Sequence, residues 1–329
     1  MHPSESLQRS WYRNGPSFWW TLPIAALYGF VVRTRRAMYR HGWMRSEPMP
    51  VPVIVVGNIT IGGAGKTPLV IALVEALRAR RFKPGVVSRG YGGSARTPML
   101  LEDDPDPSVV GDEPALIKLR TRVPVAIGRD RAAAARLLLH QNVDVIVADD
   151  GLQHYALARD IEISVVDGTR RFGNGRLLPS GPLREPLSRL QEMDFIVCNG
   201  GQPQHDEIPM RLQAASALNL RDESSRALDE FANQRAHAVA GIGNPQRFFD
   251  MLRRQGIDPI EHIFPDHHAY SARDLEFDDS LPLLMTEKDV VKCRSFAKEN
   301  WWSVPVAAGL SETFFDAVAQ RLRTSSHKR

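Results

Sequence analysis

The sequence predicts an α/β protein built on a mostly parallel sheet, and three observations support this class. Short apolar runs rich in β-branched residues alternate with amphipathic helix patterns, as in strand–helix–strand units. Several runs end in glycine or acidic residues, which is typical of strands that present a ligand site at their carboxyl ends. A second block of such patterns begins near residue 235, and 329 residues suffice for two domains.

We expect four parts in the chain. Residues 1–49 form an N-terminal helical segment, residues 50–200 the main core, and residues 235–329 a smaller α/β domain. Residues 201–234 lack clear strand alternation and are expected to be a connector.

Composition narrows the class of function. The chain is 43% hydrophobic and 24% charged, as soluble globular proteins are, and its net charge of +4 is mild. We find no nucleic-acid-binding motif and expect no nucleic-acid partner. Cys198 and Cys293 are isolated, which excludes a CxxC metal pair and a disulfide framework and fits a reducing compartment.

The first part of the chain has the character of an amphipathic, membrane-associated helix. Residues 14–32 carry no charge and are rich in aromatic and aliphatic side chains, and an arginine cluster follows within residues 33–40. Aromatic residues beside cations suit a boundary with anionic headgroups. The uncharged run approaches the roughly 20 residues of a membrane span, but Pro16, Pro23 and Gly29 interrupt it. We favour a helix lying in the interface, with a true span and an ordinary packed helix as alternatives.

The strongest motif follows this segment. A strand pattern at residues 51–56 leads into a glycine-rich turn, then Lys66 and Thr67, then a helix pattern from Leu69. In such a phosphate-binding loop, backbone N–H groups and the helix N-terminus face the anion, the lysine reaches the terminal phosphates and the threonine holds Mg²⁺. Thr60 replaces the first glycine of G-x-x-x-x-G-K-[ST]. The sequence therefore predicts a P-loop NTPase-like core, with nucleotide contacts from Thr60, Ile61, Gly62, Gly63, Ala64, Gly65, Lys66 and Thr67.

Two further strand ends supply candidate site residues. A glycine-rich loop that carries Arg89 and Tyr91 follows a short strand pattern, and we favour a ligand loop there over a plain turn. Asp149 and Asp150 end the apolar run that begins at residue 143. In phosphate-loop proteins a strand-end carboxylate holds Mg²⁺ or its water; a simple strand-terminating turn is the alternative.

Other polar residues are ambiguous on local sequence alone. Asp112 and Glu113 precede a helix pattern, where they could be an N-cap and a first-turn acid. Arg131, at another helix start, is either a solvated charge or an anion clamp. The long loop at residues 170–186 holds four arginines, which suit an anionic substrate. The histidine pair that begins at His267 is, by itself, more readily structural than catalytic.

Taken together, the motifs make the chain resemble the tetraacyldisaccharide 4′-kinases, the lipid A 4′-kinases of Gram-negative bacteria. The resemblance covers nearly the whole chain, and a non-glycine at the position of Thr60 is usual in that family. It rests on the motifs at residues 27–29, 56–68, 88–93, 111–114, 149–154, 171–175, 240–243, 266–267 and 286–289.

The resemblance implies transfer of the γ-phosphate of ATP, with Mg²⁺, to the 4′-hydroxyl of a lipid A disaccharide 1-phosphate, giving lipid IVA. It also implies a peripheral or N-terminally anchored enzyme on the cytoplasmic face of the bacterial inner membrane, with the anionic membrane surface as a partner. We expect a monomer. Membrane association suits such an acceptor, because each acyl CH₂ removed from the bilayer costs about 0.8 kcal/mol.

The resemblance further implies roles for single residues. Asp112 is the expected base for the sugar hydroxyl, with His267 as its partner from the second domain. Lys66 and Arg131 are expected to neutralise the phosphoryl group in transfer. The expected Mg²⁺ ligands are Thr67, Glu113, Asp149 and Asp150. The expected substrate contacts are Arg89, Tyr91, Arg184 and Glu185.

Two other classes of protein compete with a kinase. A phosphate-loop GTPase switch or metallochaperone would need a guanine-reading [NT]-K-x-D, but residues 286–289 place lysine one position late, and no cysteine-rich metal motif exists. A non-catalytic, membrane-bound nucleotide sensor would give Asp112 no functional role.

Overall fold

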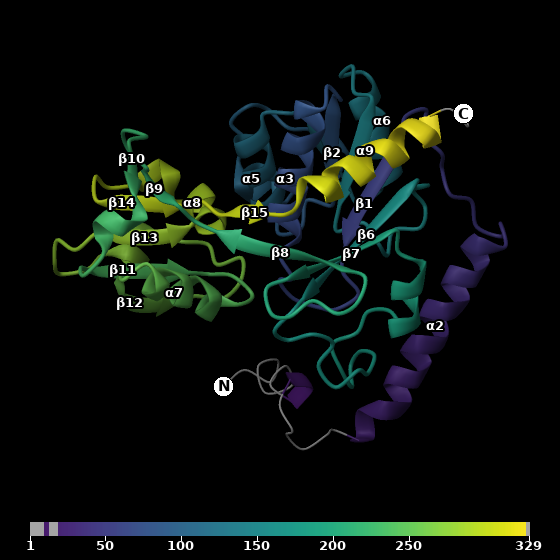
Figure 1. Ribbon diagram of the computed structural model, residues 1–329, viewed down its shortest axis with the longest axis horizontal. Coiled ribbons are helices and arrows are strands. Elements are labelled where there is room, and N and C mark those ends of the chain that lie inside the picture. Colours follow the sequence, from purple (N-terminus) through teal and green to yellow (C-terminus); the bar gives the residue numbers. More distant parts are fainter. Residues whose placement is uncertain (1–9, 13–18, 327–329) are drawn as a thin grey trace.

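The computed structural model of the chain describes residues 10–12 and 19–326. The described residues form two sheets, one of nine strands and one of six, which lie side by side (Figure 1). The predicted α/β class with a large parallel sheet is confirmed. The strands of the large sheet are β1 Val53–Gly57, β2 Pro84–Ser88, β3 Met99–Leu100, β4 Val125–Ile127, β5 Val145–Asp149, β6 Ile161–Asp167, β7 Phe195–Asn199, β8 Glu207–Gln213 and β15 Ala307–Gly309.

The strand order of the large sheet places the phosphate-loop strand at its centre. The order is β15-β8-β7-β6-β1-β5-β2-β4-β3, and β15 and β3, at the two edges, are the antiparallel strands. The chain first builds β2, β4 and β5 on one side of β1 and then β6, β7 and β8 on the other. β1 therefore lies at a topological switch point, where open α/β sheets bind their ligands.

Helices cover both faces of the large sheet. On one face α3 Lys66–Ala79, α5 Asp112–Thr121 and α9 Glu312–Ser326 share one hydrophobic cluster, and on the other α6 Arg131–Leu139 packs on a second cluster. Because both faces are covered, β1 and β5 are buried at every position, which explains their continuous apolar sequences. The short elements of this part are α4 Pro107–Val110 and η2 Leu187–Glu192.

The six-stranded sheet belongs to the smaller domain. Its strand order is β10-β9-β14-β13-β11-β12, with α7 against one face and α8 against the other. The strands are β9 Ser216–Asn219, β10 Ser225–Ala227, β11 Arg235–Ala240, β12 Asp258–Ile263, β13 Leu283–Thr286 and β14 Trp301–Val304. The helices are α7 Pro245–Arg254, α8 Glu287–Cys293, η3 Leu228–Phe231, η4 Ala272–Leu275 and η5 Arg294–Phe296.

The links between the two sheets differ from the expected connector. Residues 201–234 contain three strands: β8 extends the large sheet, whereas β9 and β10 form an edge of the small one. Strand β8 carries Pro209 and buries only Met210, so its sequence lacks an apolar alternation. The chain returns through β15, paired antiparallel to β8, and α9 then joins the core of the large sheet.

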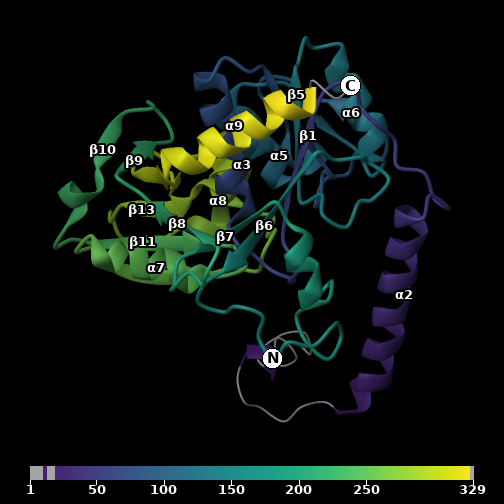
Figure 2. The same ribbon diagram turned by 45° about the vertical axis from the view of Figure 1, so that its right-hand side comes forward.

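The N-terminal helix runs along one side of the molecule, away from both sheets (Figures 1 and 2). The turn η1 Trp19–Thr21 leads into α2 Leu22–Arg40, whose buried residues are Ala25 and Gly29. A Cβ at Gly29 would lie 2.7 Å from Leu177 Cδ1, so glycine allows the helix its close approach to the long loop. Within the described residues no helix has the length and apolarity of a membrane span. Residues 14–18 of the expected uncharged run lie outside the described part.

Candidate active site

The phosphate loop connects β1 to α3 at the carboxyl edge of the large sheet. Gly62 and Gly65 have φ angles of 103° and 94°, in the left-handed region that favours glycine. Lys66 is the first residue of α3, so its side chain and the free N–H groups of that helix start at the same place. A Cβ on Gly65 would lie 2.2 Å from Asn199 Nδ2, which donates a hydrogen bond to Ala64 O at 2.9 Å. The loop is thus supported from the end of β7.

Thr60 has a structural place in this loop. It is 7% exposed and forms an isolated antiparallel bridge with Leu183 of the long loop. Ile61 N donates to Pro182 O at 2.8 Å. The residue that departs from the motif therefore ties the phosphate loop to the arginine-rich segment at residues 170–186.

Lys66 lies beside Asp150, the acid that follows β5. Its Nζ is 3.6 Å from Asp150 Oδ1 and 3.3 Å from Asn58 Oδ1. Asp150 also accepts from Arg184 Nη2 at 2.9 Å. Burial opposes ionisation of Asp150, but Lys66 and Arg184 outweigh it and hold the pKa of this carboxyl well below its usual range.

Asp149 has the opposite environment. It ends β5 at 1% exposure, and its Oδ1 has no hydrogen-bond partner among the described residues. Burial, Glu113 and Asp150 raise the pKa of Asp149 well above its usual range. An orphaned buried carboxylate oxygen, with its ionisation opposed by neighbouring acids, is an arrangement that a bound cation would relieve.

Arg131 begins α6 and points at the same strand end. Its Nη2 donates to Asp150 O at 2.7 Å, and the side chain is 7% exposed. Burial lowers the pKa of its guanidinium, against the charges of Asp150 and Asp149. The Nε has no partner among the described residues. Of the two possibilities for Arg131, the solvated surface charge is therefore excluded.

A carboxylate–imidazole pair joins the two domains. Asp112, the first residue of α5, places Oδ2 3.0 Å from His267 Nδ1, which belongs to the loop after β12. Asp112 is 6% exposed. Burial opposes its ionisation, yet the hydrogen bond with His267 and the charge of Lys292 lower the pKa of Asp112. The sequence offered no signal for Lys292, whose Nζ lies 3.7 Å from Asp112 Oδ2.

The glycine-rich loop after β2 packs against this pair. Tyr91 and His267 meet edge to face with ring centroids 5.0 Å apart, and Tyr91 is 62% exposed. A Cβ on Gly93 would lie 2.3 Å from Val109 O, so only glycine allows the loop to lie against the residues before Asp112. Arg89 is exposed.

Of the remaining predicted residues, some lie in the candidate site and others in the packing behind it. Glu113 Oε1 is 3.4 Å from Lys288 Nζ of the small domain. Thr67 follows Lys66 and is half-buried. Glu185 is 1% exposed, and its oxygens accept from Gln153 Nε2 at 2.9 Å and Tyr155 OH at 2.8 Å. It therefore lies behind the loops rather than at a free surface.

The four expected Mg²⁺ ligands do not form a closed cage. Throughout residues 10–12 and 19–326, no three His, Cys, Asp or Glu side chains are arranged to hold a metal ion. Asp149, with its orphaned oxygen, is the described residue that best fits the cation.

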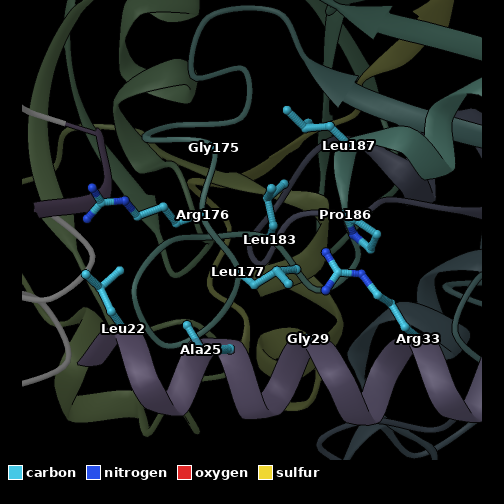
Figure 3. Close-up of a pocket in the computed structure, with 11 residues that line it drawn as sticks. Leu22, Ala25, Gly29, Arg33, Gly175, Arg176, Leu177, Leu183, Pro186 and Leu187 are labelled. Carbon is cyan, nitrogen blue, oxygen red and sulfur yellow. The ribbon is translucent and has the colours of Figure 1, made fainter. Parts of the chain in front are cut away.

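An apolar groove of about 410 Å³ lies between α2 and the long loop (Figure 3). Leu22, Ala25 and Gly29 line it from the helix, and Leu177 and Leu183 face them from the loop. The groove thus lies beside the loop that contacts Thr60 and that carries Arg184.

A phosphate loop at a topological switch point and an acid–imidazole pair contributed by two domains define the class of protein. It is a protein with a P-loop NTPase-like fold. Residues 17–323 match the family model described as LpxK, tetraacyldisaccharide-1-P 4′-kinase. The chain belongs to this family, which confirms the resemblance seen in its motifs.

Relatives and a solved structure agree with this assignment. The tetraacyldisaccharide 4′-kinase of Stenotrophomonas maltophilia (strain R551-3) is 52% identical, with 95% of each chain covered. That of Nitrosococcus oceani (strain ATCC 19707) is 47% identical, covering 99% of this chain and 97% of the relative. The crystal structure of LpxK from Aquifex aeolicus in complex with ATP matches with a TM-score of 0.78 at 28% identity, over 92% of this chain and 98% of the other.

Proposed function

We propose that the chain transfers the γ-phosphate of ATP to the 4′-hydroxyl of a tetraacyldisaccharide 1-phosphate, giving lipid IVA. The observation that carries this proposal is the contact between Asp112 and His267. In this proposal Asp112 is the proton acceptor for the hydroxyl, and the phosphate loop, whose Lys66 Nζ lies 3.6 Å from Asp150 Oδ1, holds ATP. A switch or a sensor has no need of such a pair.

Asp112 is the general base in this mechanism. As the bond from the sugar oxygen to the γ-phosphorus forms and the bond to the bridging oxygen breaks, the hydroxyl proton passes to the Asp112 carboxylate. His267 orients that carboxylate through Oδ2. The lowered pKa of the Asp112 carboxyl keeps this group ionised at neutral pH and ready to accept the proton.

Lys66 and Arg131 neutralise charge on the phosphates. Lys66 Nζ is held by Asn58 and Asp150 near the strand end, and a bound phosphate would compete for the same ammonium group. Asp149 and Thr67 would hold Mg²⁺, with Glu113 and Asp150 close by. Held by these residues, Mg²⁺ would supply positive charge that offsets the negative charge developing on the phosphates.

The N-terminal helix supplies the membrane contact in this proposal. Trp19, Leu27 and Phe30 are 75%, 64% and 65% exposed, and arginines occupy the later turns of α2. Such a surface suits the anionic inner-membrane interface on the cytoplasmic side. The enzyme would work there as a monomer, with the acyl chains of its acceptor still in the bilayer. Arg89, Tyr91 and Arg184 are the proposed substrate contacts, with Glu185 holding their surroundings in place.

The test is phosphate transfer from γ-labelled ATP to the purified disaccharide 1-phosphate in detergent micelles. We expect wild-type protein to label the disaccharide and Lys66→Ala to lose this activity. Removing a general base costs typically 10²–10⁴-fold, so Asp112→Asn should lower kcat within about that range while ATP still binds.

The control is Asp104→Asn, which neutralises an exposed acid in the loop between β3 and α4 and should leave kcat unchanged. Label that passes only to water or to another acceptor with wild-type protein would overturn the proposed function. Full kcat in Asp112→Asn would remove Asp112 from its role as base.

A further inference from the structure

A second link between the two domains lies directly at the phosphate loop. Arg247 of α7 places Nη2 3.1 Å from Asp167 Oδ1. Asp167 ends β6, the neighbour of β1, and is 4% exposed. Arg170 binds the other oxygen of the same carboxylate, with Nε 3.0 Å from Oδ2, and its Nη2 donates to Gly63 O at 3.0 Å. One buried acid thus holds one guanidinium from each domain.

The charges in this cluster do not cancel. Two guanidinium groups share one carboxylate, which leaves a net positive charge beside the loop. Asp167 Oδ1 also accepts the N–H groups of Thr169 and Arg170 at 3.0 Å, so the acid is fixed in position. The side chains of Arg170 and Arg247 are 24% and 26% exposed, which leaves part of each guanidinium open to an incoming anion.

The small domain lies close enough to the phosphate loop for this cluster to act on a nucleotide. A Cβ on Gly243, just before α7, would lie 3.2 Å from Gly63 N. The N–H groups of this part of a phosphate loop cradle the phosphates. A guanidinium bonded to Gly63 O therefore lies next to the place where phosphate charge arrives.

We propose that Arg170 and Arg247 form an arginine pair that stabilises the transferring phosphoryl group, with Arg247 supplied in cis by the small domain and Asp167 positioning both. In phosphoryl transfer negative charge grows on the bridging oxygen as its bond to the γ-phosphorus breaks, and a guanidinium next to that oxygen lowers the barrier. The inference rests on the proposed function for its acceptor. It goes beyond that function because it gives the small domain a direct part at the phosphates.

The decisive comparison is Arg247→Gln against Arg253→Gln. Both residues lie on α7, but Arg253 pairs with the exposed acid Asp250. Arginines supplied to phosphoryl transfer contribute 10³–10⁵ in kcat, so Arg247→Gln should lower kcat by at least about 100-fold. The affinity for ADP should change less than about threefold, and Arg253→Gln should behave as wild type.

A transition-state mimic distinguishes a role of Arg247 in phosphoryl transfer from a role in holding the domains together. ADP with Mg²⁺ and aluminium fluoride should bind Arg247→Gln much more weakly than wild type, although ADP alone binds both equally. Millimolar guanidinium ion should restore part of kcat in Arg247→Gln and none in Lys66→Ala. Arg170→Gln should show the same pattern.

Two results would overturn the inference. One is wild-type kcat in Arg247→Gln. The other is a loss of activity in which the affinities for ADP and for its aluminium fluoride complex fall by the same factor and guanidinium restores no activity. This result would mean that Arg247 only holds the two domains together. Failure of the proposed function has a different signature: wild type would leave the disaccharide unlabelled, while any slow hydrolysis of ATP would still depend on Arg247.

Discussion

At the scale of single residues, neighbouring acids lie in opposite electrostatic environments. Asp149 belongs to the buried end of β5, whereas Asp150 turns into a left-handed conformation with φ of 45° and meets Lys66 and Arg184. Burial acts on both carboxyls, but only Asp150 has enough adjacent cations to outweigh it. Burial and neighbouring acids thus dominate at Asp149, whereas adjacent cations dominate at Asp150.

His154 makes the stability of this region depend on pH. Burial, Arg131 and Arg159 lower the pKa of His154 to about 4 from its ordinary 6.5. The folded state therefore favours the neutral ring, and its stabilising effect is complete above pH 6.5 and is lost as the pH falls towards 4. We expect the Tm of wild type to drop across this window and His154→Gln to flatten the drop, as measured by calorimetry.

The matched control is His205→Gln, because the ring of His205 is 96% exposed. This variant should keep the wild-type dependence of Tm on pH. An equal slope in His154→Gln and wild type would show that this ring does not titrate differently in the folded and unfolded states.

At the scale of elements, burial decided what the sequence could reveal. Strands such as β1 and β5 are covered on both faces, so their residues are uniformly apolar and were predictable. Strand β8, which lies next to the edge strand β15, and the edge strand β12 are mostly half-buried or exposed and carry proline and charged residues, so they gave no pattern.

The same contrast holds in the candidate site. The phosphate loop is contiguous and could be read directly from the sequence. The sequence carries no local signal for Arg247, Lys292 or Asn199. Each of them contacts a residue on another element, 80 or more positions away in the sequence. Glu185 is expected at the substrate only from the family resemblance, and its buried hydrogen bonds depend on tertiary packing that no local pattern encodes.

The exposed apolar face of α2 leads to a prediction about membrane binding. Leu27→Ser with Phe30→Ser removes two large exposed side chains that are proposed to enter the bilayer. Burying each is worth about 1.5–3 kcal/mol, so binding to vesicles rich in phosphatidylglycerol should fall by roughly two orders of magnitude or more. Co-sedimentation measures this loss, and Tm should be unchanged because neither side chain is in the core.

Ile263→Ser is the control for this prediction. Ile263 is 58% exposed but lies at the end of β12 in the small domain. Its loss should leave vesicle binding at the wild-type level. If the double variant in α2 also binds normally, the helix is not the membrane contact.

At the scale of the whole molecule, function depends on two domains that meet over the phosphate loop. Gly243→Val tests this arrangement, because even a Cβ there would lie 3.2 Å from Gly63 N and 3.8 Å from Asp266 Oδ2. Overpacking costs typically 1–3 kcal/mol. Because this cost falls on the contact of the small domain with the phosphate loop, the affinity for ATP should fall by roughly tenfold. Both sheets remain intact, and Tm should hold. Isothermal titration with ATP gives the measurement.

Ala215→Val, at an exposed position before β9, adds the same side chain away from the interface and should bind ATP normally. Normal ATP affinity in Gly243→Val would mean that the domains separate at no cost when nucleotide binds.

The place of α9 in the fold has a consequence for biosynthesis. Phe314, Val318 and Leu322 are buried in the same cluster as residues of β1 and α3, although they are made after every strand of both sheets. While the chain is still growing, the large sheet therefore lacks one of its covering helices, and apolar surface of α3 stays open to water. All strands of the small domain have been synthesised by then. The small domain is thus able to fold before the large domain is complete, and we expect the nascent chain to be most prone to aggregation just before α9 emerges.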